Sequence, residues 1–204
     1  MSRRSTRSRV LLSLALVGSA ASVAGLGTYG SFTSTTSASQ TVATGTVTLA
    51  LGATGASTNR LTVNASGLVP GDTVQRSFDL ENTGSEDLAS VTFTSSASTS
   101  SLLDTDATDG LQMVVERCSV PWTEAGVSPA FTYTCGGATT TVVASRPVIG
   151  SGVALANLTV TTAGATDHLR LTLTLPATAG NTFQGLSSTV SYGFTGTQRA
   201  ATNR

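Results

Sequence analysis

The chain has 204 residues, which sets one domain as the expectation, and its charged residues are only 11% of the total and formally balanced. Because no basic surplus is present to attract nucleic acid, this composition argues against a nucleic-acid-binding protein. Thr, Val and Leu are abundant and aromatic residues are only 5%, which favours β-strands, since β-branched side chains pack well on a pleated surface.

The first thirty residues have the layout of a secretory signal peptide. A basic cluster precedes an apolar run over residues 10–26, and small residues follow it. The cluster consists of Arg3, Arg4, Arg7 and Arg9. Cleavage after Gly30 would leave a net charge of −4, because the leader holds four of the eleven arginines and no acid. The alternative is a retained membrane anchor, since the apolar run is about as long as the shortest spanning helix.

Residues 31–42 form a predicted N-terminal arm. This segment is rich in Ser and Thr, and its one large apolar side chain is Phe32. It lacks the apolar alternation needed to hold a place in its own sheet, so we expect a flexible arm. A single domain then covers residues 43–204.

The domain sequence alternates with a period of two residues. Alternating apolar side chains occur over residues 46–51, 61–63, 74–80, 91–93, 111–115, 131–133, 169–175 and 190–194. No window of twelve residues after the leader keeps a helical period. Eight or more strands with one apolar face each predict an all-β fold, in which two antiparallel sheets stack face to face.

Cys118 and Cys135 are the only two cysteines. In an exported protein such a pair normally oxidises, and the chain-entropy model gives about 3 kcal/mol of stabilisation for a loop of this length. A metal site or a reactive thiol is the alternative, but the chain has no CxxC spacing and no nearby histidine. We expect a structural disulfide that clips a hairpin or loop between the strands ending near Arg117 and Thr134.

The sequence offers little catalytic chemistry. A zinc peptidase needs about three side-chain ligands and a general base, commonly from a His-Glu-x-x-His motif, whereas this chain has one histidine, His168. Serine chemistry lacks both a Gly-x-Ser-x-Gly motif and a second histidine. We therefore predict that the protein is not an enzyme and carries no cofactor.

One acidic loop is a candidate calcium site. Asp104, Asp106 and Asp109 precede Gly110, and carboxylate oxygens are ligands that suit calcium. The spacing departs from that of an EF-hand loop, because Asp109 and Gly110 each come one position late. The alternative is a solvated acidic loop that leads into the next strand.

Five short stretches occur in a distinctive order along the chain. They are GTYGSF at 27–32, ATGTVTL at 43–49, LVPGD at 68–72, FDLENTG at 78–84 and YGFTGTQ at 192–198. Together they resemble the TasA/camelysin (CalY) family of secreted Gram-positive proteins, although residues 95–166 have no family pattern. The resemblance implies a jelly-roll-like sandwich whose leader is removed by a SipW-type signal peptidase. It also implies a place at the cell surface or in the extracellular matrix, often as a fibre subunit of biofilm.

Two functions follow as expectations. The first is a secreted structural protein that assembles into fibres by strand addition, with the arm of one copy placing Phe32 in a pocket of the next. Unguarded sheet edges favour this function, because the chain has no lysine and residues 43–51 carry no charge. The alternative is a monomeric binding or adhesion module at the cell surface. Partners would be other copies and other matrix or cell-wall components, besides the signal peptidase. The family's metalloprotease label is disfavoured by the single histidine.

Overall fold

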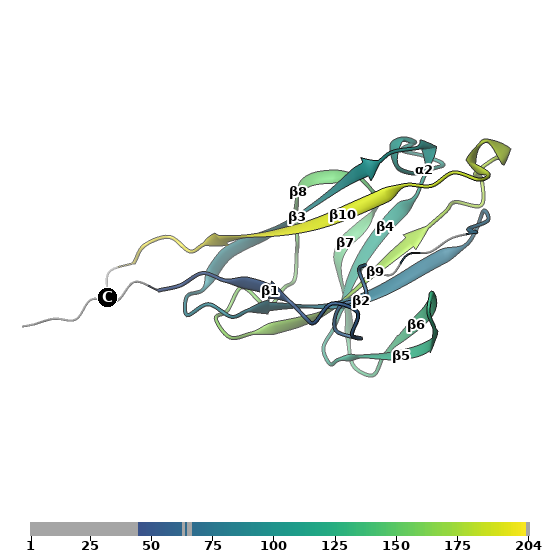
Figure 1. Ribbon diagram of the computed structural model, residues 1–204. Coiled ribbons are helices and arrows are strands. Elements are labelled where there is room, and N and C mark those ends of the chain that lie inside the picture. The colour runs from purple at the N-terminus through teal and green to yellow at the C-terminus, as the bar shows by residue number, and fades with distance from the viewer. Residues whose placement is uncertain (1–44, 63, 65–66, 203–204) are drawn as a thin grey trace, which may run out of the picture. The chain divides into compact units, whose positions relative to one another are not determined.

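Two antiparallel sheets face each other across an apolar core in the computed structural model of the protein (Figure 1). The structure describes residues 45–62, 64 and 67–202. The predicted leader over residues 1–30 and the predicted arm over residues 31–42, with Phe32, lie outside these residues.

Ten strands lie in the described part of the chain. They are β1 (Leu49–Leu51), β2 (Thr73–Asn82), β3 (Leu88–Thr99), β4 (Gln112–Cys118), β5 (Trp122–Val127), β6 (Ala130–Cys135), β7 (Thr139–Pro147), β8 (Gly150–Ala154), β9 (Thr166–Thr174) and β10 (Thr189–Gln198). Two short helical turns accompany them, α2 (Leu102–Thr105) and the 3-10 turn η1 (Asn181–Phe183). The predicted all-β sandwich is confirmed. Within the described residues, no helix is long and apolar enough to cross a membrane.

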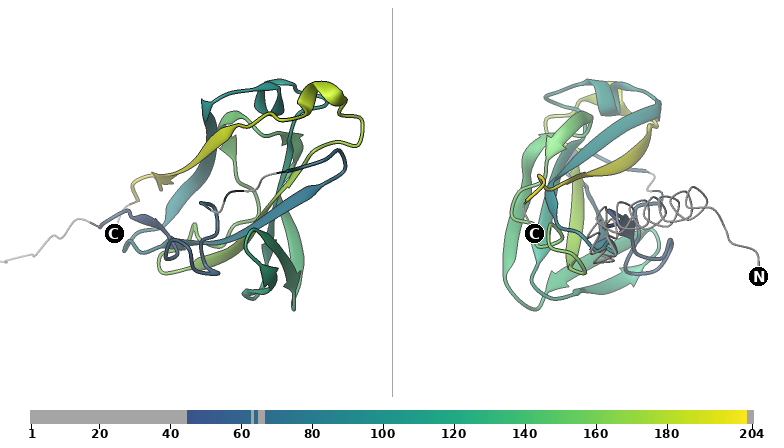
Figure 2. Two further views of the ribbon diagram at one scale, coloured as in Figure 1. Left: turned by 45° about the vertical axis from the view of Figure 1, so that its right-hand side comes forward. Right: turned by 90° about the vertical axis from the view of Figure 1, so that its left-hand side faces the viewer.

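The strand order identifies the type of sandwich. The larger sheet has the order β1-β2-β9-β4-β7 and the smaller sheet the order β10-β3-β8, while β5 and β6 form a separate hairpin (Figures 1 and 2). When β1 and the hairpin are left out, the two sheets have the strand orders β2-β9-β4-β7 and β10-β3-β8. A jelly roll from which the first strand is missing has these same strand orders. In a complete jelly roll that strand pairs with the last one, at the edge of the smaller sheet. Among the described residues β10 pairs with β3 alone, so no described strand takes this position.

Alternation along the strands builds the core. On β9, Leu169 and Leu171 point inward and are almost completely buried. Phe78 of β2 lies opposite Leu169 in the register and meets the ring of Phe194 on β10, with 5.3 Å between ring centroids. The ring of Phe93 on β3 lies 5.3 Å from that of Phe194. Aromatic side chains therefore join the two sheets along β10.

The FDLENTG stretch forms the corner between β2 and β3. The side chain of Asn82 is buried; its Nδ2 donates to the carbonyl of Glu86 and its Oδ1 accepts from the amide of Gly84. A Cβ at Gly84 would lie 2.4 Å from the carbonyl oxygen of Thr46, so only glycine fits this close approach. The stretch thus fixes how the segment leading into β1 approaches the sandwich.

Two predicted strands differ from the structure. The alternation over residues 46–51 yields only the three-residue β1, and Leu61 and Thr62 form a turn instead of a strand, with residue 63 outside the described part. The turn is held by Arg60, whose amide donates to the carbonyl of Ser77 and whose side chain pairs with Glu124 of β5. These long-range contacts override the local pattern.

Asp167 holds the loop that precedes β9. Its carboxylate is 1% exposed and accepts from the amides of Thr159 and Val160, at 2.7 and 2.8 Å, and from the Thr159 hydroxyl at 2.6 Å. It also pairs with Arg117 of β4 at 3.1 Å. A single buried charge therefore joins one loop to the larger sheet.

We predict that Asp167→Asn lowers the free energy of unfolding by about 2–4 kcal/mol, because a neutral amide cannot replace a carboxylate that receives four donors. Urea unfolding measures the loss. Glu81→Gln, a half-buried carboxylate on the neighbouring strand, is the control and should change stability by less than about 0.5 kcal/mol. Equal unfolding midpoints for the two variants would contradict this role.

Candidate functional site

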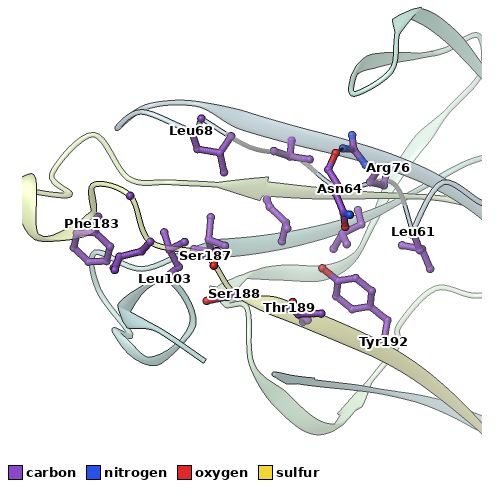
Figure 3. Close-up of a pocket in the computed structure, with 18 residues that line it drawn as sticks. Leu61, Asn64, Leu68, Arg76, Leu103, Phe183, Ser187, Ser188, Thr189 and Tyr192 are labelled. Atoms are coloured by element: carbon purple, nitrogen blue, oxygen red, sulfur yellow. Dashed lines mark hydrogen bonds between the residues drawn. The ribbon is translucent and has the colours of Figure 1, made fainter. Parts of the chain in front are cut away.

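A cavity of about 530 Å³ lies along the edge of β10 that does not face β3 (Figure 3). We call it the β10 cavity. Its walls come from β2, β9 and β10 and from the loops around α2 and η1. The lining side chains include Leu61, Asn64, Leu68, Val74, Arg76, Leu103, Leu111, Leu171, Leu173, Phe183, Leu186, Ser187, Ser188, Thr189, Val190 and Tyr192. The cavity lies beside β10, on the side where a complete jelly roll has its first strand. No described residue fills that strand position.

The two ends of the β10 cavity differ in chemistry. Leu68, Leu103 and Phe183 lie at one end, whereas Arg76 and Tyr192 lie toward the other (Figure 3). Arg76 is the one charged side chain among the described residues that line the cavity. The cavity is therefore apolar at one end and cationic at the other.

Arg76 breaks the inward alternation of β2, because it shares the face of Val74 and Phe78. The residue is 4% exposed, and its guanidinium donates to the carbonyl oxygens of Gln75 at 2.6 Å and of Asn64 at 3.4 Å. Burial lowers the pKa of Arg76. The guanidinium thus contributes a desolvated positive charge to the cavity wall.

Tyr192 presents its ring and hydroxyl to the same cavity. The ring stacks on Phe93 with 5.8 Å between centroids. Burial raises the pKa of Tyr192 to about 12, against an opposing effect of the Arg76 charge. The hydroxyl therefore stays protonated at neutral pH and can donate a hydrogen bond.

A smaller cavity continues the apolar surface along β10. Its volume is about 260 Å³, and its lining residues are Leu49, Ala50, Leu51, Leu80, Tyr192 and Phe194. Tyr192 lines both cavities. Apolar surface therefore accompanies β10 from Val190 to Phe194.

The rim of the β10 cavity is tied together by Asp104. This residue closes a capping box at the start of α2, accepting from the amide of Ser101 at 2.7 Å, and it also accepts from the hydroxyl of Ser188 at 2.5 Å. Burial alone would raise the pKa of Asp104, but hydrogen bonds from Ser188, from the Ser101 amide and from Ser100 hold the pKa below its usual value. Asp104 thus links α2 to the segment that enters β10.

The other two acids of the calcium candidate are engaged separately. Asp106 accepts from the amides of Thr108 and Asp109 at 2.9 Å each, and Asp109 accepts from the hydroxyl of Thr178 at 2.6 Å. In the described part of the chain, no three acidic, histidine or cysteine side chains are grouped as a metal site. The geometry gives the calcium hypothesis no support, and it stays an untested prediction.

The disulfide predicted between Cys118 and Cys135 is present, with 5.6 Å between the Cα atoms. It joins the end of β4 to the end of β6 and so holds the β5–β6 hairpin against the larger sheet. Guanidinium groups stack on the aromatic rings of the hairpin: Arg60 lies 4.6 Å from the ring centroid of Phe131, and Arg170 lies 4.3 Å from that of Trp122. Sequence analysis missed these contacts, because Arg60 and Arg170 are distant from the hairpin in sequence.

We predict that replacing both cysteines by alanine lowers the free energy of unfolding by about 2–4 kcal/mol. Intact mass before and after reduction should differ by two hydrogens, and a thiol reagent should label neither cysteine in the native protein. Full labelling of both cysteines in the unreduced native protein would refute the bridge.

The residues do not fit a zinc site built within one chain. All eleven acids, His168 and both cysteines lie among the described residues, so no such ligand comes from the rest of the chain. The cysteines are bonded to each other, and His168 Nδ1 lies 2.8 Å from Asp79 Oδ1 without a third ligand grouped beside them. A mononuclear zinc peptidase site needs three protein ligands and an open position.

We predict that the purified protein, incubated with excess zinc and then desalted, retains well below one zinc ion per chain by elemental analysis. EDTA should leave the melting temperature unchanged, because the described acidic, histidine and cysteine side chains form no three-ligand group that could hold a metal. His168→Ala provides a comparison and should retain the same background of zinc. Stoichiometric zinc in the parent protein that is lost in His168→Ala would overturn this conclusion.

Comparison with known families places the chain. Residues 8–119 match the model of the family described as camelysin metallo-endopeptidase. A search of curated proteins found no match. The family description implies a metal ion, which the side chains described above do not fit. Because the match over residues 8–119 covers more than half of the sequence, the chain belongs to the camelysin family.

Proposed function

We propose that the protein is a secreted structural protein of the cell surface or extracellular matrix, which assembles into fibres by strand addition. In this proposal a signal peptidase removes residues 1–30 during export. Residues 31–42 then form an arm that takes the strand position beside β10 in another copy. The observation that carries the proposal is that, among the described residues, β10 pairs with β3 alone and borders a largely apolar cavity.

The opposite side of the sandwich is protected against such addition. There the chain passes from β7 into β8, and the following segment covers the edge of β7: the amide of Ala156 donates to the carbonyl of Val142, and the side chain of Asn157 donates to the carbonyl of Thr141.

The smaller sheet also lacks the charges that guard edges in soluble proteins, because β3, β8 and β10 contain no charged residue. Strand addition is therefore favoured at β10.

The direction of the chain suggests head-to-tail assembly. The described chain enters β1 at the end of the sandwich opposite α2, where β10 finishes (Figure 1). A copy stacked with this end against the α2 end of its neighbour would extend its arm into the β10 cavity, antiparallel to β10. Twelve residues span about 40 Å when extended, which is enough to bridge the two copies and to pair with the first half of β10. Repetition of this contact gives an open filament.

Phe32 acquires a specific place in this arrangement. It is the second residue after the proposed cleavage point, so it would lie deep in the acceptor, near Tyr192 and Leu51. The smaller cavity at this position is lined almost wholly by apolar side chains. Burying one phenylalanine there contributes on the order of 2 kcal/mol.

A monomeric binding or adhesion module remains the second candidate function. The observation that favours it is the cationic end of the β10 cavity, which an uncharged strand does not require. We do not propose the peptidase activity in the family description, because the side chains do not fit its metal.

We predict that the mature protein forms filaments and that deletion of Ser31–Gln40 abolishes them, as measured by light scattering and electron microscopy. A matched control replaces the same ten residues by a Gly/Ser segment of equal length, which should also fail to assemble, because it lacks Phe32 and strand-forming residues. Leu173→Trp, which fills the β10 cavity, should block the acceptor while leaving the arm intact.

Mixing the two defective proteins gives the sharpest result. Arm-deleted copies have an intact acceptor and Leu173→Trp copies have an intact arm, so each should be monomeric alone and the mixture should form heterodimers. Filaments that grow equally well without the arm would rule out the mechanism. An absence of filaments and of heterodimers would favour the monomeric module.

A further inference from the structure

The β10 cavity has features that strand addition does not explain. A peptide strand needs backbone partners and pockets for alternate side chains, but it does not need a buried cation. Arg76 is nevertheless placed at one end of an otherwise uncharged lining, with its residue only 4% exposed. Its guanidinium is held at the cavity wall by hydrogen bonds to the carbonyl oxygens of Gln75 and Asn64.

The cationic end is suited to a single carboxylate. A guanidinium has five N–H donors in a planar fork, which matches the two oxygens of a carboxylate. The Tyr192 side chain approaches the same end of the cavity (Figure 3), and its hydroxyl, protonated at neutral pH as in any tyrosine, can donate a hydrogen bond. No carboxylate of the protein lines the cavity among the described residues, so no acid in the lining repels an anionic ligand.

The rest of the cavity is suited to an unbranched hydrocarbon chain. Leu68, Leu103 and Phe183 form the far end (Figure 3), and Val74, Leu173 and Leu186 add further apolar lining. The volume of about 530 Å³ lies within the usual range of small-ligand sites. One charge at one end and apolar surface at the other are the complement of an amphiphile with a single anionic head.

We propose that the β10 cavity binds a medium-chain monocarboxylate, with its head group on Arg76 and Tyr192 and its chain directed toward Leu68, Leu103 and Phe183. The binding itself does not require assembly. The ligand shares its position with the arm, so it would also compete with strand addition, and this consequence rests on the proposed function. The cavity would thus couple fibre growth to the local concentration of fatty carboxylates.

Isothermal titration of the arm-deleted protein, in which no arm can occupy the cavity, with octanoate and with 1-octanol tests the head group. Both probes have the same chain length, so the ratio of their affinities reports the carboxylate alone. We expect octanoate to bind at least tenfold more tightly than octanol. A series from hexanoate to decanoate should gain about fourfold in affinity per methylene, because each methylene is buried in the cavity.

Variants locate the site. Arg76→Gln should weaken octanoate binding to the level of octanol and leave octanol binding unchanged, whereas Leu173→Trp should abolish both. Tyr192→Phe keeps the ring and removes only the hydroxyl, so it tests the same end of the cavity if Arg76→Gln fails to fold; we expect octanoate binding to weaken threefold to tenfold. Equal affinities of octanoate and octanol in the parent protein, or equal losses of both in Arg76→Gln and Tyr192→Phe, would overturn the proposal.

The same titrations separate the two proposals. If the protein forms no filaments but binds octanoate through Arg76, the proposed assembly fails and the ligand site stands. If filaments form but octanoate does not bind, the ligand site fails and the assembly stands. Where both hold, decanoate should slow filament growth in the parent protein, and an unchanged growth rate would refute the competition.

Discussion

The smaller sheet lacks one edge strand among the described residues, and both cavities along β10 follow from this. In the described residues, β10 forms hydrogen bonds with β3 on one side and with no strand on the other. Backbone N–H and C=O groups on that side need partners, and the apolar side chains of β10 need cover. A jelly roll normally meets both needs with its first strand. The two cavities along β10 are the physical consequence of leaving this position open within the described part of the chain.

Arg76 connects the open side to the rest of the molecule. It lies on β2, lines the β10 cavity and reaches to 5.9 Å from the ring centroid of Phe131 in the β5–β6 hairpin. The disulfide fixes that hairpin, and Arg60 and Arg170 stack on its rings. The hairpin therefore stabilises the outer side of the sheet whose edge forms the cavity wall.

Local sequence predicted the faces of the strands well and their partners poorly. Leu169 and Leu171 were recognisable as core residues because alternation depends only on neighbouring positions. The cysteine pair was recognisable because no other pairing is possible. The strand order and the short β1 depend on contacts between distant residues, such as Arg60 with Glu124, which alternation cannot reveal. Arg76 was visible in the sequence as an exception to the alternation of β2, but only the structure shows that it lines the β10 cavity. Phe32, the residue predicted to mediate assembly, lies outside the described residues.

Hydrogen exchange along β10 tests the central claim most directly. The account predicts that, in the monomeric protein, β10 amides pointing away from β3 exchange rapidly, while those bonded to β3 are protected. On assembly, the rapidly exchanging amides between Thr189 and Phe194 should become protected as the arm pairs with them. Protection of both sets already in the monomer, or no change on assembly, would contradict the claim that this edge is the site of strand addition.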